Sequence, residues 1–143
     1  MTARQLSVFV ENKPGRLAEI TSVLAEENVD IRAVSVSDTT DFGILRLILS
    51  DPDRGCEVLR SHGCTVSLTP VIVIRINDQP GGLAGPMKLL YQNGISVEYM
   101  YAFLSKVQDS ASVILRVSDC EKAVALLNEN GIALISEEEI RNM

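Results

Sequence analysis

The sequence has one histidine, three cysteines and no apolar run long enough to cross a membrane. A membrane-spanning helix needs roughly 18 or more predominantly apolar residues, so we expect no membrane association. The first residues lead directly into a strand-like segment and do not resemble a secretory leader. An odd number of cysteines without a Cys-x-x-Cys pair favours free thiols in a reducing compartment. We therefore expect a cytoplasmic protein.

The sequence also lacks the usual signatures of catalysis and of nucleic-acid binding. Its 13 Lys and Arg residues are scattered and are outnumbered by 19 Asp and Glu, which leaves a net charge of -6 and excludes a phosphate-binding basic patch. There is no P-loop or GxGxxG motif, and the single His62 leaves no histidine-based triad. His62, Cys56 and Cys64 match no zinc spacing, so the two cysteines are interpreted as core residues. We expect no enzyme activity, cofactor or metal.

An internal repeat is the dominant feature of the chain. The segment 11–18 returns as 77–84, a shift of 66 positions that carries Gly15 onto Gly81. Segment 29–31 returns at the same shift as 95–97, and Ser50-Asp51 returns at a shift of 68 as Ser118-Asp119. Between these, Ile44–Leu47 resembles Ile114–Val117 at a shift of 70, which places four extra residues in the polar stretch 105–110. Because the matches survive insertions only where loops are expected, we infer a duplicated unit.

Each repeat has the hydrophobic pattern β-α-β-β-α-β. In the first we expect strands at 6–10, 29–37, 43–49 and 65–68, helices near 17–24 and 53–62, a turn at 38–41, and Gly63 closing the second helix. In the second we expect strands at 71–76, 95–104, 111–117 and 132–135, and helices at 82–93 and 119–130. On the helix 82–93 the spacing predicts that Leu83, Met87, Leu90 and Tyr91 are buried.

This order predicts an α+β fold of two ferredoxin-like units in tandem, comprising residues 1–69 and 70–143. Each unit would have a four-stranded antiparallel sheet with both helices on one face. The strands at 44–49 and 71–74 are apolar on both faces, although an open sheet face is normally polar. Because a monomer seldom exposes such a patch, we expect a homodimer or larger assembly.

The Pro-Gly turn after the first strand of each repeat is the candidate binding site. Proline fixes φ, glycine permits a tight turn, and the first amides of the following helix lack partners within that helix. Such amides can hold a carboxylate, while Asn12, Asp78 or Gln79 could hold an ammonium or amide group. The alternative is that Pro-Gly only forms the turn and Asn12 caps the helix. Gly81, Gly82 and Gly85 make the second turn loose, which favours either close approach of a ligand or a degenerate copy kept for packing.

The strand-[N/D]-x-x-Pro-Gly-x-Leu-Ala-helix pattern, within units of about 65 residues, resembles the ACT domain. The resemblance covers nearly the whole chain as two tandem domains. It implies a regulatory module that binds an amino acid where two domains meet, through the first turn of one domain and the second strand of its neighbour. The candidate ligand-binding residues are Asn12, Lys13, Pro14, Gly15, Arg16, Leu17, Asp30 and Ile31 in the first repeat, and Asp78, Gln79, Gly81, Gly82, Leu83, Ser96 and Val97 in the second.

Two functions remain open at this point. The first is a non-catalytic sensing protein that binds an amino acid at an interface between ACT-like domains and signals through an enzyme partner or its own assembly state. The second is an adaptor or dimerisation module that regulates a partner enzyme without binding a small molecule. A small enzyme on this scaffold is a third class, since a fold alone does not exclude chemistry.

Overall fold

The computed structural model describes residues 1–11, 13–38 and 42–143, and two compact units emerge from its internal contacts. The N-terminal unit comprises Arg4–Thr69 with Ile140–Met143, and the C-terminal unit comprises Met1–Ala3 with Pro70–Glu139. For the two repeats as such we propose the boundaries 1–69 and 70–143, which differ from the compact units only at the termini. The turn expected at 38–41 lies largely outside the described residues.

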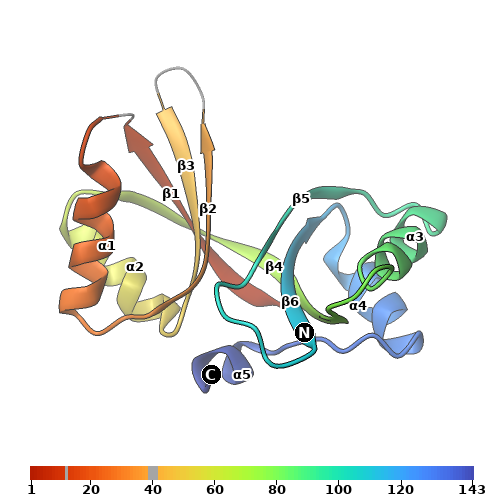
Figure 1. Ribbon diagram of the computed structural model, residues 1–143. Helices are drawn as coiled ribbons and strands as arrows, with labels where there is room; N and C mark the ends of the chain where they lie inside the picture. The colour runs from red at the N-terminus through yellow and green to blue at the C-terminus, as the bar shows by residue number, and fades with distance from the viewer. Residues whose placement is uncertain (12, 39–41) are drawn as a thin grey trace. The chain divides into compact units, whose positions relative to one another are not determined.

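The N-terminal unit has the expected order of elements. They are β1 (Ala3–Glu11), α1 (Arg16–Glu26), β2 (Ile31–Asp38), β3 (Phe42–Leu49), α2 (Pro52–Ser61) and the first part of β4 (Thr65–Asn77). The strand order is β2-β3-β1-β4, and β3 is antiparallel to both β1 and β2. Both helices cover one face of this sheet (Figure 1). The ferredoxin-like α+β unit is confirmed here.

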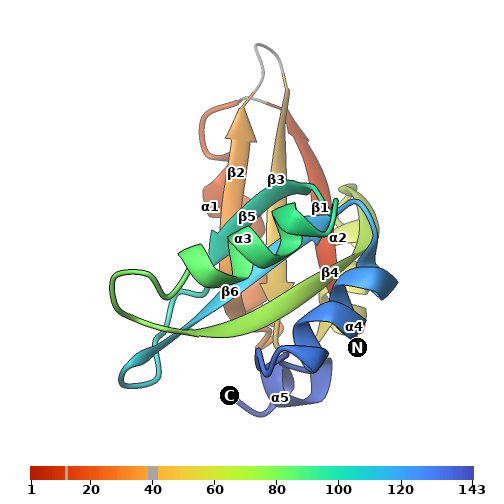
Figure 2. The same ribbon diagram turned by 90° about the vertical axis from the view of Figure 1, so that its right-hand side faces the viewer.

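The C-terminal unit repeats this arrangement with a shortened sheet. Its elements are the remainder of β4, then α3 (Ala84–Gln92), β5 (Val97–Ala102), β6 (Ser110–Val117), α4 (Cys120–Glu129) and α5 (Glu137–Arg141). The strand order is β4-β6-β5, and α3 and α4 lie on one face of it (Figure 2). The strand expected at 132–135 is reduced to an isolated antiparallel bridge of Leu134 with Ile74, flanked by backbone hydrogen bonds from Arg75 to Ala133 and from Ile135 to Val73. The strands expected at 65–68 and 71–76 are one continuous strand, because Pro70 is accommodated without ending β4.

The helices pack largely as their apolar spacing predicts, although Leu17 and Tyr91 are exposed. Ile20, Val23 and Leu24 of α1 are buried, and their burial removes apolar surface worth about 1.5–3 kcal/mol per side chain from water. On α3, Leu90 is fully buried, whereas Tyr91 is 83% exposed, so its expected burial is wrong. Tyr91 lies about 100° around the helix from Leu90, which points it away from the core.

The register of the strands corrects the alignment of the two repeats. Leu6 pairs with Leu47, and Ile72, which is 66 positions after Leu6, pairs with Leu115. Strand β6 therefore matches β3 at a shift of 68, not the 70 inferred from the sequence, and the second hairpin is two residues longer rather than four. A shift of two residues keeps every side chain on the same face of a strand. Hydrophobic patterning could not distinguish the two alignments for this reason.

The last residues of the chain belong to the N-terminal unit through Arg32. Its Nε donates to the carbonyl oxygen of Ile140 at 3.0 Å, and its Nη2 donates to that of Met143 at 2.9 Å. Arg32 also forms an ion pair with Asp30, and the side chain of Ile140 is buried. The guanidinium therefore satisfies carbonyl groups at the end of α5 that have no partner within that helix.

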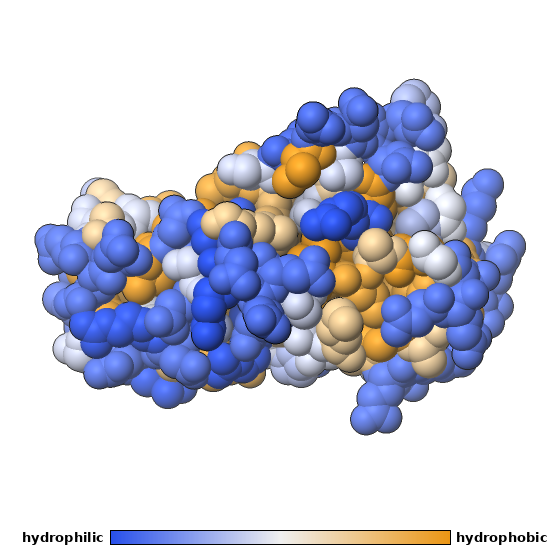
Figure 3. All heavy atoms as spheres, turned by 90° about the horizontal axis from the view of Figure 1, so that it is seen from below, coloured by the Kyte–Doolittle hydropathy of each residue, from blue (hydrophilic) through white to orange (hydrophobic). Residues whose placement is uncertain are grey.

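Hydrophilic side chains cover much of the face in Figure 3 and separate several apolar patches. In the described parts of the chain, every helix falls short of the length and apolar character that a bilayer span requires. Cys56 and Cys64 are buried, which confirms their interpretation as core residues.

We expect the equivalent caps of α2 and α4 to stabilise the fold alike. Asp51 accepts a hydrogen bond from the amide of Arg54 at 3.0 Å, and Asp119 accepts one from the amide of Lys122 at 3.1 Å. Asp51→Ala and Asp119→Ala should each lower the free energy of unfolding by about 0.5–2 kcal/mol, measured by urea denaturation. Glu26→Ala, an exposed acid outside any cap, is the control and should change it by less than about 0.5 kcal/mol. Capping variants as stable as this control would contradict the assignment.

Candidate functional site

A left-handed glycine turns the chain from β1 into α1. Gly15 has φ of 81° and is the residue immediately before the helix, a conformation that costs other L-residues about 1–2 kcal/mol. It has no side chain with which to cap the helix, and it forms no side-chain cap hydrogen bond. We call the segment 13–15 the first corner. Asn12, the cap considered in the sequence, lies outside the described residues.

The start of α1 presents backbone donors beside this corner. The amide of Arg16 closes the turn onto the carbonyl of Lys13 at 3.3 Å, and the amide of Glu19 begins the helical ladder by donating to Gly15 at 3.0 Å. Between them, the amides of Leu17 and Ala18 have no hydrogen-bond acceptor among the described residues. The positive end of the helix dipole lies at the same place. This arrangement favours an anionic group.

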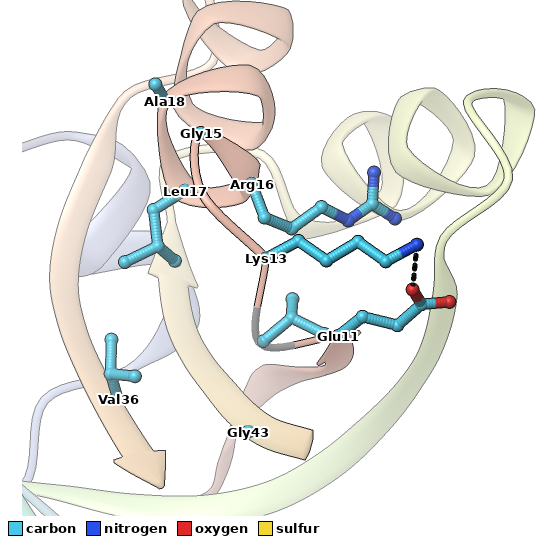
Figure 4. Close-up of a pocket in the computed structure, with 9 residues that line it drawn as sticks. Glu11, Lys13, Gly15, Arg16, Leu17, Ala18, Val36 and Gly43 are labelled. Carbon is cyan, nitrogen blue, oxygen red and sulfur yellow. Dashed lines mark ion pairs between the residues drawn. The ribbon is translucent and has the colours of Figure 1, made fainter. Parts of the chain in front are cut away.

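A pocket with an apolar wall lies beside these amides. It has a volume of about 300 Å³, at the lower end of the range of roughly 300–1,000 Å³ for small-molecule sites. Leu17 is 43% exposed and Val36 is 51% exposed, and Figure 4 shows them across an open space from each other. We call this space the corner pocket. Its lining residues are Val10, Glu11, Lys13, Gly15, Arg16, Leu17, Ala18, Val36 and Gly43.

The other flank of the first corner is charged. Glu11 and Lys13 form an ion pair with 2.6 Å between Oε2 and Nζ, which is drawn in Figure 4. The hydrogen bond from Lys13, aided by its charge, lowers the pKa of the Glu11 carboxyl below its ordinary value. The guanidinium of Arg16 lies 3.2 Å from Glu19 and 3.8 Å from the sulfur of Cys64. Two carboxylates and two cations therefore surround the same turn, in a hollow of about 370 Å³ that also contacts Pro14.

The second-strand candidates lie away from their corners. The amide of Asp30 donates to the hydroxyl of Ser50 at 2.9 Å, and the amide of Ser96 donates to that of Ser118 at 3.1 Å. Ile31 and Val97 pack against the cores of their units. Asp30 and Ile31 lie just before and at the start of β2, and Ser96 and Val97 lie just before and at the start of β5. Val36, by contrast, is near the end of β2 and lines the corner pocket. The structure does not bring them together with the turn of their own unit.

The second corner, residues 78–81, has the same backbone turn but different surroundings. Gly81 has φ of 86°, and Leu83 precedes α3. Asp78 is paired with Lys106 at 2.7 Å, and the amide of Gln79 donates to the carbonyl of Asn77 at 2.9 Å.

The glycine that follows this corner packs directly against the chain. A Cβ on Gly82 would lie 1.9 Å from the carbonyl oxygen of Asn77, so no other residue fits there. The extra glycine therefore permits close packing of the turn on its own strand.

Sequence reasoning missed part of the corner pocket. Val36 and Gly43 come from the hairpin β2–β3, and Val10 and Glu11 end the strand before the turn. The repeat could have indicated Glu11, because it is the first residue of the matching segment. Val36 and Gly43 carry no such signal, since only the pairing of Val36 with Leu45 and of Gly43 with Val10 brings them to the corner.

Comparison with known structures finds close and distant relatives. The crystal structure of protein BT0572 from Bacteroides thetaiotaomicron superposes with a TM-score of 0.93 and 38% identity, covering 100% of this chain and 98% of that one. The ligand-free regulatory subunit of aspartate kinase from Thermus thermophilus gives a TM-score of 0.64 and 16% identity, covering 90% and 92%. Its counterpart from Thermus flavus gives 0.61 and 18%, covering 87% and 88%. The last two show a shared fold, and the comparison with curated proteins finds no match.

The comparison with family models agrees with the tandem fold. One model, described as an ACT domain pair, matches residues 1–143. Such pairs are typically regulatory, ligand-binding modules and are generally non-catalytic. The duplicated unit and the turn that occurs in both repeats agree with this match. This chain therefore belongs to the family of ACT domain pairs.

Proposed function

We propose that this protein is a non-catalytic regulatory protein that binds an amino acid at its first corner. The supporting observation is that the amides of Leu17 and Ala18 have no acceptor among the described residues and belong to residues that line the corner pocket, beside the charged pair Glu11–Lys13. An amino acid carries a carboxylate, an ammonium and a side chain on one carbon. The corner and the adjacent strand β2 together offer backbone donors, a carboxylate acceptor and an apolar wall.

The ligand fits the corner in one orientation. Its carboxylate accepts hydrogen bonds from the amides at the start of α1, where the helix dipole adds to the attraction. Its ammonium donates to Glu11, which is ionised at neutral pH and whose carboxyl pKa Lys13 lowers further below its ordinary value. Its side chain lies against Leu17 and Val36. Charge-assisted hydrogen bonds of this kind are about twice as strong as neutral ones.

The regulatory role follows from the exposure of the apolar wall. Leu17 and Val36 leave a half-exposed apolar surface at the mouth of the pocket, and a ligand side chain lying there would still face water on one side. We propose that a domain of a second copy, or an enzyme partner, covers this mouth in the cytoplasm. Binding would then stabilise the covered arrangement over the uncovered one, which is how a ligand shifts a population.

Binding should be detected as a thermal shift. The twenty protein amino acids are screened one at a time, and an amino acid at a hundredfold excess over its Kd should add about 2.7 kcal/mol to the free energy of unfolding. Glu11→Gln removes the charged acceptor and should weaken binding. Glu26→Gln is the same change at the last residue of α1, away from the corner, and should leave binding unaltered. If no amino acid shifts the melting temperature of the wild type, the adaptor function is favoured instead.

The ion pair predicts a pH dependence. Because the folded pKa of Glu11 is lowered, the pair stabilises the fold above the ordinary carboxyl range, and this contribution is lost as the pH falls through the lowered pKa. Lys13→Gln should raise the pKa of Glu11 towards its ordinary value, measured by NMR titration of the labelled side-chain carboxyl. A bound amino acid, through its ammonium, should lower it again in this variant. A Glu11 pKa that does not respond to Lys13→Gln would rule out the pairing.

A further inference from the structure

The apolar wall of the corner pocket comes from two elements of the N-terminal unit. Leu17 projects from the first turn of α1 and Val36 from β2, and Figure 4 shows their side chains on opposite sides of an open space. Both side chains are about half exposed. An apolar group placed between them would therefore remove apolar surface of both residues from water, which is favourable in proportion to the area covered.

A glycine keeps part of this pocket open. Gly43 of β3 pairs with Val10 and lines the pocket without a side chain. A Cβ at Gly43 would lie 3.4 Å from Cγ2 of Val10 and 3.2 Å from the carbonyl oxygen of Ser37. Even a methyl group here would thus occupy space next to another lining residue, so the glycine leaves room for a ligand side chain.

The charged side chains around the first corner are already paired with each other. Glu11 pairs with Lys13, and Arg16 pairs with Glu19. The other described residues that line the pocket have no hydroxyl, amide or charged side chain: they are Val10, Gly15, Leu17, Ala18, Val36 and Gly43. A polar ligand side chain that entered the space between Leu17 and Val36 would lose its hydration without gaining a side-chain partner, which costs free energy.

We infer that the corner pocket selects amino acids with apolar side chains, and that Val36 and Gly43 determine this selectivity. The inference rests on the proposed function and adds the chemical class of the ligand. The carboxylate and ammonium that all amino acids share contact the corner itself and do not distinguish one ligand from another. Selectivity comes instead from the hairpin β2–β3, which supplies both residues.

Pairs of amino acids with matched shapes test the selectivity by isothermal calorimetry. Asparagine has nearly the shape of leucine but carries a polar amide, and glutamine has the same relation to methionine. We expect leucine and methionine to bind at least about tenfold tighter than their polar counterparts. Equal or tighter binding of asparagine and glutamine, or of glutamate and lysine, would overturn the inference while leaving the proposed function intact.

Val36→Thr tests the contribution of β2 to the wall. Threonine keeps the shape of valine and its preference for strands, while its hydroxyl offers a polar ligand side chain a hydrogen bond. The ratio of the asparagine Kd to the leucine Kd should fall at least about threefold. In the control Val107→Thr, which changes a similarly exposed valine between β5 and β6, the ratio should keep its wild-type value.

This ratio separates selectivity from stability, because both ligands are measured on the same variant and a change in folding alone affects them equally. A ratio that Val36→Thr leaves at its wild-type value would overturn the role of Val36 in the inference.

Gly43→Ala tests the open part of the pocket independently. The added methyl group should weaken the binding of leucine at least about threefold more than that of alanine, because the larger side chain needs the space next to Val10. Equal weakening of both ligands would overturn the role of Gly43. Should this variant fail to fold, as judged by circular dichroism, the ratios for Val36→Thr decide. A wild type that binds none of the twenty amino acids would refute the proposed function, and this inference with it.

Discussion

The site depends on how α1 begins. A helix has amides at its start that no residue of the same helix can satisfy, and most helices cover them with a serine, threonine, aspartate or asparagine side chain. Here the residue before α1 is Gly15 in a left-handed conformation, which contributes no side chain. The amides of Leu17 and Ala18 consequently have no acceptor among the described residues, and both residues line the corner pocket. In the same unit α2 is capped by Asp51, so the contrast lies within one domain.

The same backbone turn occurs twice in the chain, with different side chains around it. Both corners keep a glycine with positive φ, at Gly15 and Gly81, because the chain must reverse between strand and helix in each unit. The side chains around that turn are under no such constraint. In the first unit Glu11 is paired with Lys13 and Arg16 with Glu19, whereas in the second Gly82 packs against the strand and Asp78 is paired with Lys106. The two turns thus share their backbone geometry and differ in the side chains around them.

Sequence patterns predicted the architecture more fully than the site. The repeated turn and the alternation of strands and helices indicated two ferredoxin-like units, as the structure and the ACT domain pair family confirm. The register of β6 could not be predicted, since two alignments differing by two residues place the same faces inward. The contribution of Val36 depends on strand pairing across a hairpin, and the contact of Arg32 with Met143 joins residues 111 positions apart. Such long-range contacts leave no local pattern in the sequence.

The central claim is that amides at the start of α1 receive the carboxylate of an amino acid. Backbone NMR of the labelled protein during addition of each of the twenty amino acids tests it most directly, because a new hydrogen bond moves the resonance of the donor amide. The account predicts that the amide resonances of Leu17 and Ala18 shift in a saturable manner. Saturable shifts that leave Leu17 and Ala18 unaffected would contradict it.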